Sequence, residues 1–140
     1  MSESLTVYVF DTSAWLTLIE DEAGADTVQD LLEKAQAGEA VLLTSFMSYM
    51  EVYYITLQER DADEARARID LMTSLPVLRI ESSNVLGFIA ADIKAHHRLS
   101  VADAWVSALA REQEAVLVHK DPEFDQVKTL IELLPLPYKV

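Results

Sequence analysis

Short apolar runs alternate with longer segments of helical periodicity along this chain of 140 residues. The runs at 5–10, 40–44, 76–80 and 115–119 have the length and composition of buried strands. The tail at 130–134 could be a last strand or a frayed end. Strands separated by helices are joined by right-handed crossovers, which favours a parallel sheet. The pattern predicts one α/β domain over residues 1–140, with a parallel sheet of about five strands flanked by helices on both faces.

Segments with helical spacing connect these runs, and polar residues mark several of their starts. One expected helix begins near residue 13 and another at residue 44 or 45. The others are expected to span 25–37, 61–74, 83–97 and 100–112. Thr12 or Ser13 could cap the first helix, and Asp61 followed by Glu64 resembles a capping box.

The charge balance restricts the partners of the chain. Twenty-four acidic residues against 11 basic ones give a formal net charge of −13, which argues against non-specific nucleic-acid binding. Because the chain has no cysteine, a thiolate metal site is excluded. No apolar run approaches the length of a membrane span, and the N-terminus lacks the basic region of a signal peptide. We expect a cytoplasmic protein without membrane association.

Three carboxylates stand alone inside the most apolar segments. Asp11 ends the first expected strand, whereas Glu51 and Asp103 lie in expected helices without another acid beside them. A carboxylate in apolar surroundings is costly unless a cation or hydrogen bonds compensate its charge. Since no lone Lys or Arg accompanies these acids, the pattern suggests that the missing cation is a metal ion.

The acids also fall where a site would form. In an open parallel sheet, ligands bind beyond the carboxyl ends of the strands. Asp11 and Asp121 each follow an expected strand, and helices packed on the sheet can bring Glu51 and Asp103 to the same rim. Oxygen ligands without cysteine suit Mg²⁺ or Mn²⁺. Two such ions roughly 4 Å apart could activate a water and stabilise the leaving oxygen in phosphodiester cleavage.

Each acid has a structural explanation as well. Asp11 could cap the helix after it, and Glu51 could bond to a buried partner. Ser100 and Asp103 match a capping box, and Asp121 before proline could be a turn residue. Capping does not exclude metal binding, so the functional interpretation depends on the convergence of the four acids.

The segments that carry these acids resemble a known family. Asp-Thr-Ser within Val9–Leu16, the acid in Ser48–Val52, Leu-Ser-Val-Ala-Asp-Ala within Leu99–Val106, and Val116–Phe124 are similar to the motifs of PIN-domain nucleases, in the family's order. The closest likeness is to the VapC-type ribonuclease toxins of toxin–antitoxin pairs. The resemblance covers essentially the whole chain.

The resemblance implies an acidic pocket for Mg²⁺ or Mn²⁺ and metal-dependent cleavage of single-stranded or structured RNA. It implies that the catalytic and metal-binding residues are Asp11, Glu51, Asp103 and Asp121. Thr12 or Ser13 would orient an acid or a metal-bound water. A cognate antitoxin and a homodimer are the expected assemblies. The segment Phe46–Tyr54 fits a subunit interface, and core packing explains its composition equally well.

Two positions depart from the family pattern. His119 stands two residues before the last acid, where many relatives have Thr or Ser, and Glu123 replaces a frequent second aspartate. The sequence leaves open how these two residues affect the fourth ligand.

Few basic residues are available to meet a phosphate. The candidates for RNA contact are Lys94, His97, Arg98, His119 and Lys120. The first three belong to a basic cluster before the Asp103 helix, which could equally be a solvated helix end favoured by the helix dipole. The other two could be ordinary residues at the end of a strand.

Other functions share parts of the pattern. Phosphoaspartyl chemistry of the haloacid-dehalogenase type would need an acid two residues after Asp11, where Ser13 stands, and a receiver domain would need an acid after the strand ending at Thr44. A non-toxin PIN nuclease in RNA processing has the same acids. A degenerate PIN-like interaction domain is favoured by the acidic surface and by His119, and opposed by the intact quartet.

Overall fold

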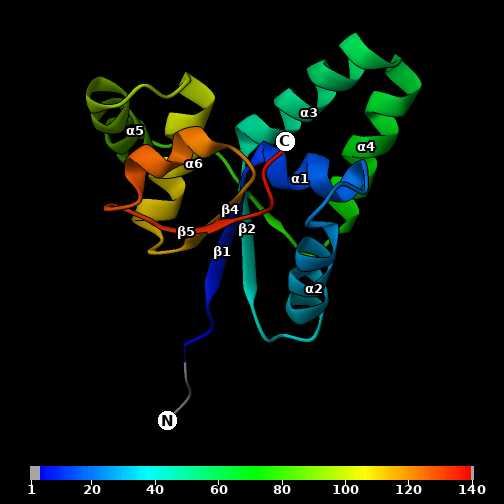
Figure 1. Cartoon of the computed structure of the whole chain (residues 1–140), viewed down its shortest axis with the longest axis horizontal. Helices are drawn as coiled ribbons and strands as arrows, with labels where there is room; N and C mark the ends of the chain where they lie inside the picture. The colour runs from blue at the N-terminus through cyan, green and yellow to red at the C-terminus, as the bar shows by residue number, and fades with distance from the viewer. Residues whose placement is uncertain (1–3, 140) are drawn as a thin grey trace.

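Five parallel strands form a single sheet in the computed structural model, which describes residues 4–139 (Figure 1). The strand order is β3-β2-β1-β4-β5. The strands are β1 (Val7–Phe10), β2 (Val41–Ser45), β3 (Leu78–Ile80), β4 (Val116–His119) and β5 (Glu132–Pro135). The predicted parallel sheet of about five strands is confirmed, and the C-terminal segment is a strand.

Six α-helices and one 3₁₀ helix surround the sheet in the described part of the chain. They are α1 (Thr12–Ile19), α2 (Ala25–Gln36), α3 (Phe46–Glu59), α4 (Ala62–Ser74), α5 (Asn84–His96), α6 (Val101–Glu112) and the 3₁₀ helix η1 (Pro122–Val127). None of them is long and apolar enough to cross a membrane.

Alternating side chains of the central strands divide the core between the two faces of the sheet. Val9 and Leu117 pack with α5 and α6 on one face, whereas Phe10 and Val118 pack with α1 to α4 on the other. Figure 1 shows α5 and α6 on the left of the strands and α1, α2 and α4 on the right. Strands that are buried on both faces need apolar residues at every position, which explains their uninterrupted hydrophobic sequences.

The register aligns the ends of the three central strands. Phe10 at the end of β1 is opposite Thr44 of β2 and Val118 of β4. The backbone N–H of Asp11 continues this pairing by donating to the carbonyl of Val118 at 3.0 Å. Residues that follow β1, β2 and β4 therefore emerge at one edge of the sheet.

Polar side chains begin the helices, with one change from the sequence prediction. Ser45, Asp61, Ser83 and Ser100 cap α3, α4, α5 and α6 respectively. The first helix is capped by Asp11, whose side chain accepts from Ser13 N, and not by Thr12 or Ser13. The alternative that Asp11 caps this helix is therefore confirmed, and the alternative with Thr12 or Ser13 was wrong because their hydroxyls bond to other groups at the sheet edge.

Candidate active site

The four predicted acids meet at the edge of the sheet where β1 and β4 end. Asp11 directly follows β1, and Asp121 follows β4 after one intervening residue. Glu51 comes from α3 and Asp103 from the first turn of α6. Their mutual repulsion shows this proximity, because Asp11, Asp121 and Glu51 each contribute to a higher pKa of Asp103.

Asp11 is the most deeply buried of the four. Its side chain is 3% exposed, and its Oδ2 accepts hydrogen bonds from the backbone N and the Oγ of Ser13. Burial raises the pKa of Asp11 to about 6, although the bonds from Ser13 oppose this change. Within residues 4–139, its buried Oδ1 has no hydrogen-bond partner. An unpartnered buried carboxylate oxygen requires an explanation, and an ion is one.

Ser13 connects Asp11 to the end of β4. Its Oγ donates to Asp11 Oδ2 and accepts from the backbone N–H of Lys120 at 2.9 Å. A hydroxyl can donate and accept at once, so this one fixes the carboxylate of Asp11 relative to the segment that carries Asp121. Ser13 therefore occupies the place expected of a residue that orients an acid.

Thr12 holds the second acid. Its Oγ1 donates to Glu51 Oε1 at 2.7 Å and also lies 2.9 Å from Ser48 Oγ. Because a hydroxyl has one proton, the donation to Glu51 leaves Ser48 to donate to Thr12. The sequence prediction missed Ser48, although its position one helical turn before Glu51 places both side chains on the same face of α3.

Asp103 carries the strongest electrostatic perturbation of the site. Burial, followed by the repulsion of Asp11, Asp121 and Glu51, raises the pKa of Asp103 to about 8. Its backbone N–H donates to Ser100 Oγ at 3.1 Å, so Asp103 belongs to a helix cap as well as to the acidic cluster. The capping interpretation from the sequence is therefore confirmed for this residue, and its role as a metal ligand stays a prediction. Without a cation, Asp103 is much harder to ionise than an ordinary aspartate.

Glu123 joins the cluster from η1. Asp103, Asp121 and Glu123 each offer a carboxylate oxygen within 4.8 Å of the others, which is close enough for a shared metal ion. Asp121 orients this turn, because its Oδ1 accepts from the backbone N–H of Glu123 at 3.0 Å. The sequence prediction noted Glu123 only as a departure from the family pattern and did not include it among the metal ligands.

The basic candidates for RNA contact differ in their environments. Lys94 and Arg98 are exposed near the end of α5, and the partly buried His97 has its Nδ1 2.9 Å from the carbonyl of Ile93. Lys120 is 6% exposed and forms an ion pair with Glu22 at 3.5 Å. His119 is fully buried. The structure therefore leaves Lys94, His97 and Arg98 accessible, pairs Lys120 with Glu22, and buries His119.

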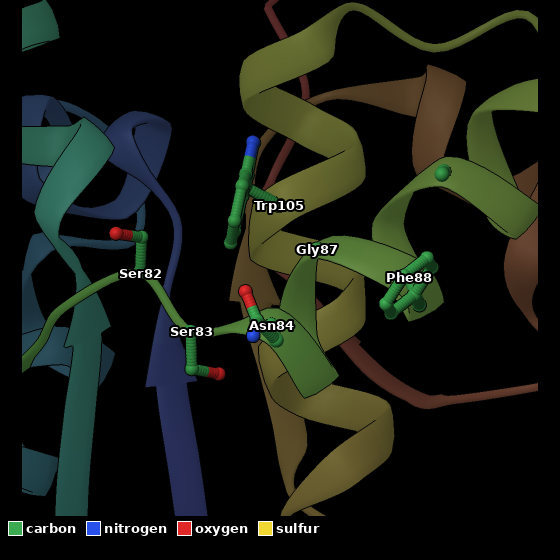
Figure 2. Close-up of a pocket in the computed structure, with 7 residues that line it drawn as sticks. Ser82, Ser83, Asn84, Gly87, Phe88 and Trp105 are labelled. Atoms are coloured by element: carbon green, nitrogen blue, oxygen red, sulfur yellow. The ribbon is translucent and has the colours of Figure 1, made fainter.

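Two cavities lie near the sheet edge. One of about 380 Å³ is lined by Ser13, Lys120 and Asp121 and thus borders the acidic cluster. The other, of about 540 Å³, lies beside α5 and α6 and is lined by Ser82, Asn84, Phe88 and Trp105 among others (Figure 2). None of the clustered acids lines the second cavity. The cavity that contains Asp121 is therefore the one that belongs to the candidate site.

Comparison with known proteins identifies the family. The PIN domain model matches residues 8–130, a range that includes all four predicted acids and Glu123. The chain belongs to the PIN-domain family. The predicted resemblance is thus confirmed for nearly the whole chain.

Solved structures share this PIN fold at low sequence identity. VapBC2 from Rickettsia felis, bound to a promoter DNA fragment, has a chain that is 17% identical with a TM-score of 0.77, covering 94% of this chain and 100% of that one. DNA-bound VapBC from Salmonella typhimurium gives 14% identity and a TM-score of 0.76, covering 94% and 98% respectively. VapC20 from Mycobacterium tuberculosis is described as a toxin that cleaves the sarcin-ricin loop. It is 20% identical with a TM-score of 0.67, and the match covers 87% of this chain and 95% of that one. No curated protein matches significantly.

Proposed function

We propose that this PIN domain is a metal-dependent endoribonuclease that hydrolyses RNA phosphodiester bonds. The observation that carries the proposal is the convergence of Asp11, Glu51, Asp103 and Asp121 at one edge of the sheet, where burial and the repulsion of the other three acids raise the pKa of Asp103 to about 8. Such a concentration of carboxylates destabilises the fold through burial and repulsion, and sites of this kind are candidates for function.

The residues present fit a hard divalent cation. The unpartnered Oδ1 of Asp11 and the carboxylate group of Asp103, Asp121 and Glu123 offer oxygen ligands, which Mg²⁺ and Mn²⁺ prefer. Asp11, Glu51, Asp103 and Asp121 would hold the metal, and Glu123 is an added candidate. Bound there, the metal would supply Lewis acidity and a water of lowered pKa for attack on phosphorus.

The remaining residues would prepare the site for that chemistry. Ser13 and Thr12 hold Asp11 and Glu51 in fixed orientations, so little reorganisation is needed when a ligand arrives. Lys94, His97 and Arg98 are the accessible basic residues that we propose meet RNA phosphates. His119 is outside this group, because its ring is buried.

We infer further that the protein is the toxin of a type II toxin–antitoxin pair and acts with a cognate antitoxin. The support is the similarity to VapBC structures over 94% of the chain. We also propose a homodimer. Phe88 and Val85 on α5 are 78% and 62% exposed, and exposed apolar groups of this size are frequent at protein interfaces. Within the segment Phe46–Tyr54, Tyr49 is buried in the core, whereas Met50 and Tyr54 are exposed and available to a partner.

Cleavage of a broad RNA panel in the presence of Mn²⁺ tests the proposed activity. The panel should include unstructured oligonucleotides and ribosomal RNA hairpins, with products mapped at nucleotide resolution. We expect cleavage at a small number of sites, because the acidic surface opposes non-specific RNA binding. Matched DNA oligonucleotides show whether the activity is specific for RNA. Absence of cleavage in every RNA, with both Mn²⁺ and Mg²⁺, would favour a degenerate interaction domain.

A further inference from the structure

His119 is enclosed at the end of β4, directly beneath the acidic site. Its side chain is fully buried, and its ring centroid lies 5.0 Å from that of Phe124 and 6.2 Å from that of Tyr138. The segment after β5 covers the same region, because the backbone N–H of Leu136 donates to the carbonyl of His119 at 2.7 Å. Direct contact between this ring and a substrate is therefore excluded in this conformation.

The ring makes one hydrogen bond within residues 4–139, and that bond reaches a proposed metal ligand. The backbone N–H of Asp121 donates to His119 Nδ1 at 3.0 Å. A ring nitrogen that accepts a hydrogen bond carries no proton, so the imidazole is neutral with its proton on Nε2. Nε2 is buried without a hydrogen-bond partner in the described part of the chain. Within residues 4–139, the polar contact of this ring is therefore made by the Nδ1 lone pair alone.

The bond fixes a turn that delivers two carboxylates. On one side, Asp121 is held through its backbone by His119, and on the other its Oδ1 accepts from the backbone N–H of Glu123. The carboxylates of Asp121 and Glu123 come within 4.8 Å of Asp103 in this conformation. Without the acceptor at position 119, the amide of Asp121 would lose its partner, and the turn would lose one of the hydrogen bonds that hold it.

We propose that His119 is a positioning residue, whose Nδ1 lone pair holds the backbone of Asp121 so that Asp121 and Glu123 stay beside Asp103. The consequence for metal binding rests on the proposed function, whereas the hydrogen bond and the tautomer of the His119 ring do not. A packing role alone is the competing explanation. In that explanation, His119 only packs against Phe124, and no hydrogen-bond acceptor is needed at position 119.

Three substitutions at position 119 separate positioning from packing. His119→Asn keeps an acceptor oxygen where Nδ1 lies, removes the unpartnered Nε2 and leaves part of the ring volume empty. His119→Gln can place its polar atoms where Nε2 lies but not where Nδ1 lies. His119→Leu fills the apolar space without any acceptor. Each protein is first checked for folding by circular dichroism, and its Mn²⁺ affinity is then measured by calorimetry.

Positioning predicts that His119→Asn binds Mn²⁺ with nearly wild-type affinity, although it melts at a lower temperature than wild type. His119→Gln and His119→Leu are expected to lose about tenfold or more in Mn²⁺ affinity, the size of effect known for groups that orient metal ligands. Equal losses in all three variants, no loss in any of them, or a loss confined to His119→Asn would overturn the proposal.

Nitrogen NMR of the wild-type protein tests the same hydrogen bond without metal or activity. The expected spectrum at pH 7 shows a neutral His119 with its proton on Nε2, and an Asp121 amide that exchanges slowly with solvent. A proton on Nδ1 would contradict the proposal directly. If the wild-type protein failed to bind Mn²⁺ while this tautomer was present, the metal-dependent function would fail and the positioning of the turn by His119 would stand.

Discussion

Asp103→Asn is expected to abolish RNA cleavage and to stabilise the metal-free protein at neutral and alkaline pH. The amide retains the size of the carboxylate but removes its charge, and it is a poor ligand for a hard cation beside the other acids. The loss of activity should exceed the roughly 10- to 100-fold effects of residues that only orient ligands. Cleavage rates at saturating Mn²⁺ measure the first effect, and thermal melts in EDTA measure the second.

The pH dependence of stability follows from the direction of the Asp103 shift. The pKa of this side chain rises from the ordinary aspartate value of 3.8 to about 8 on folding, so between these values the folded state binds more protons than the unfolded state. Stability of the metal-free wild type should therefore decrease as the pH rises from about 4 to about 8. One pKa unit corresponds to about 1.4 kcal/mol, and after a discount for partial exposure we expect a loss on the order of 2–4 kcal/mol.

Asp103→Asn should lack most of this decrease, because the side chain no longer ionises. Its melting temperature in EDTA is expected to exceed that of wild type at pH 8 and to match it near pH 4. Asp70→Asn on the exposed face of α4 is the matched control, since it removes the same charge outside the acidic cluster. Full cleavage by Asp103→Asn, or equal stability gains in both variants at pH 8, would contradict the assignment of the site.

Removal of divalent metal is expected to reduce RNA cleavage as strongly as Asp103→Asn does. Excess EDTA should stop RNA cleavage completely, and Mn²⁺ added back beyond the chelator should restore it. The physical reason is that the clustered carboxylates repel phosphate unless a cation offsets their charge. Metal that binds only the folded state should also raise the melting temperature of wild type in proportion to the logarithm of its concentration.

Two controls make the chelation experiment specific. A metal-independent ribonuclease in the same buffer should continue to cleave in EDTA, which excludes an effect of the chelator on the RNA. Asp103→Asn should show a much smaller rise in melting temperature with Mn²⁺ than wild type. Unchanged cleavage by the wild-type protein in excess EDTA would rule out metal-dependent chemistry.

Local sequence patterns were sufficient to predict the fold and the gathering of the four acids. Buried parallel strands need continuous apolar runs, and strand ends in such a sheet share one edge, so Asp11 and Asp121 could be placed from the order of elements alone. Helix starts were predictable where a serine or aspartate caps its own helix, as Ser100 does for α6.

The features that could not be predicted from the sequence depend on contacts between residues far apart in the chain. Lys120 lies against Glu22, which is far from it in the chain, so no local pattern showed that this lysine is enclosed. His119 follows apolar strand residues in the sequence, but only the packing of Phe124 and Tyr138 buries its ring. Glu123 approaches Asp103 because the turn after β4 folds back as a 3₁₀ helix, which the loop composition did not indicate.

If the carboxylates at the sheet edge bind a divalent metal, anomalous diffraction from crystals soaked in Mn²⁺ will locate the ion there. We predict an anomalous peak in contact with Asp11 or Asp103, with Asp121 or Glu123 as a further ligand. The same peak should be absent in Asp103→Asn crystals or greatly reduced. An anomalous map without a peak at these carboxylates, from crystals that hold Mn²⁺ elsewhere, would contradict metal binding at this site.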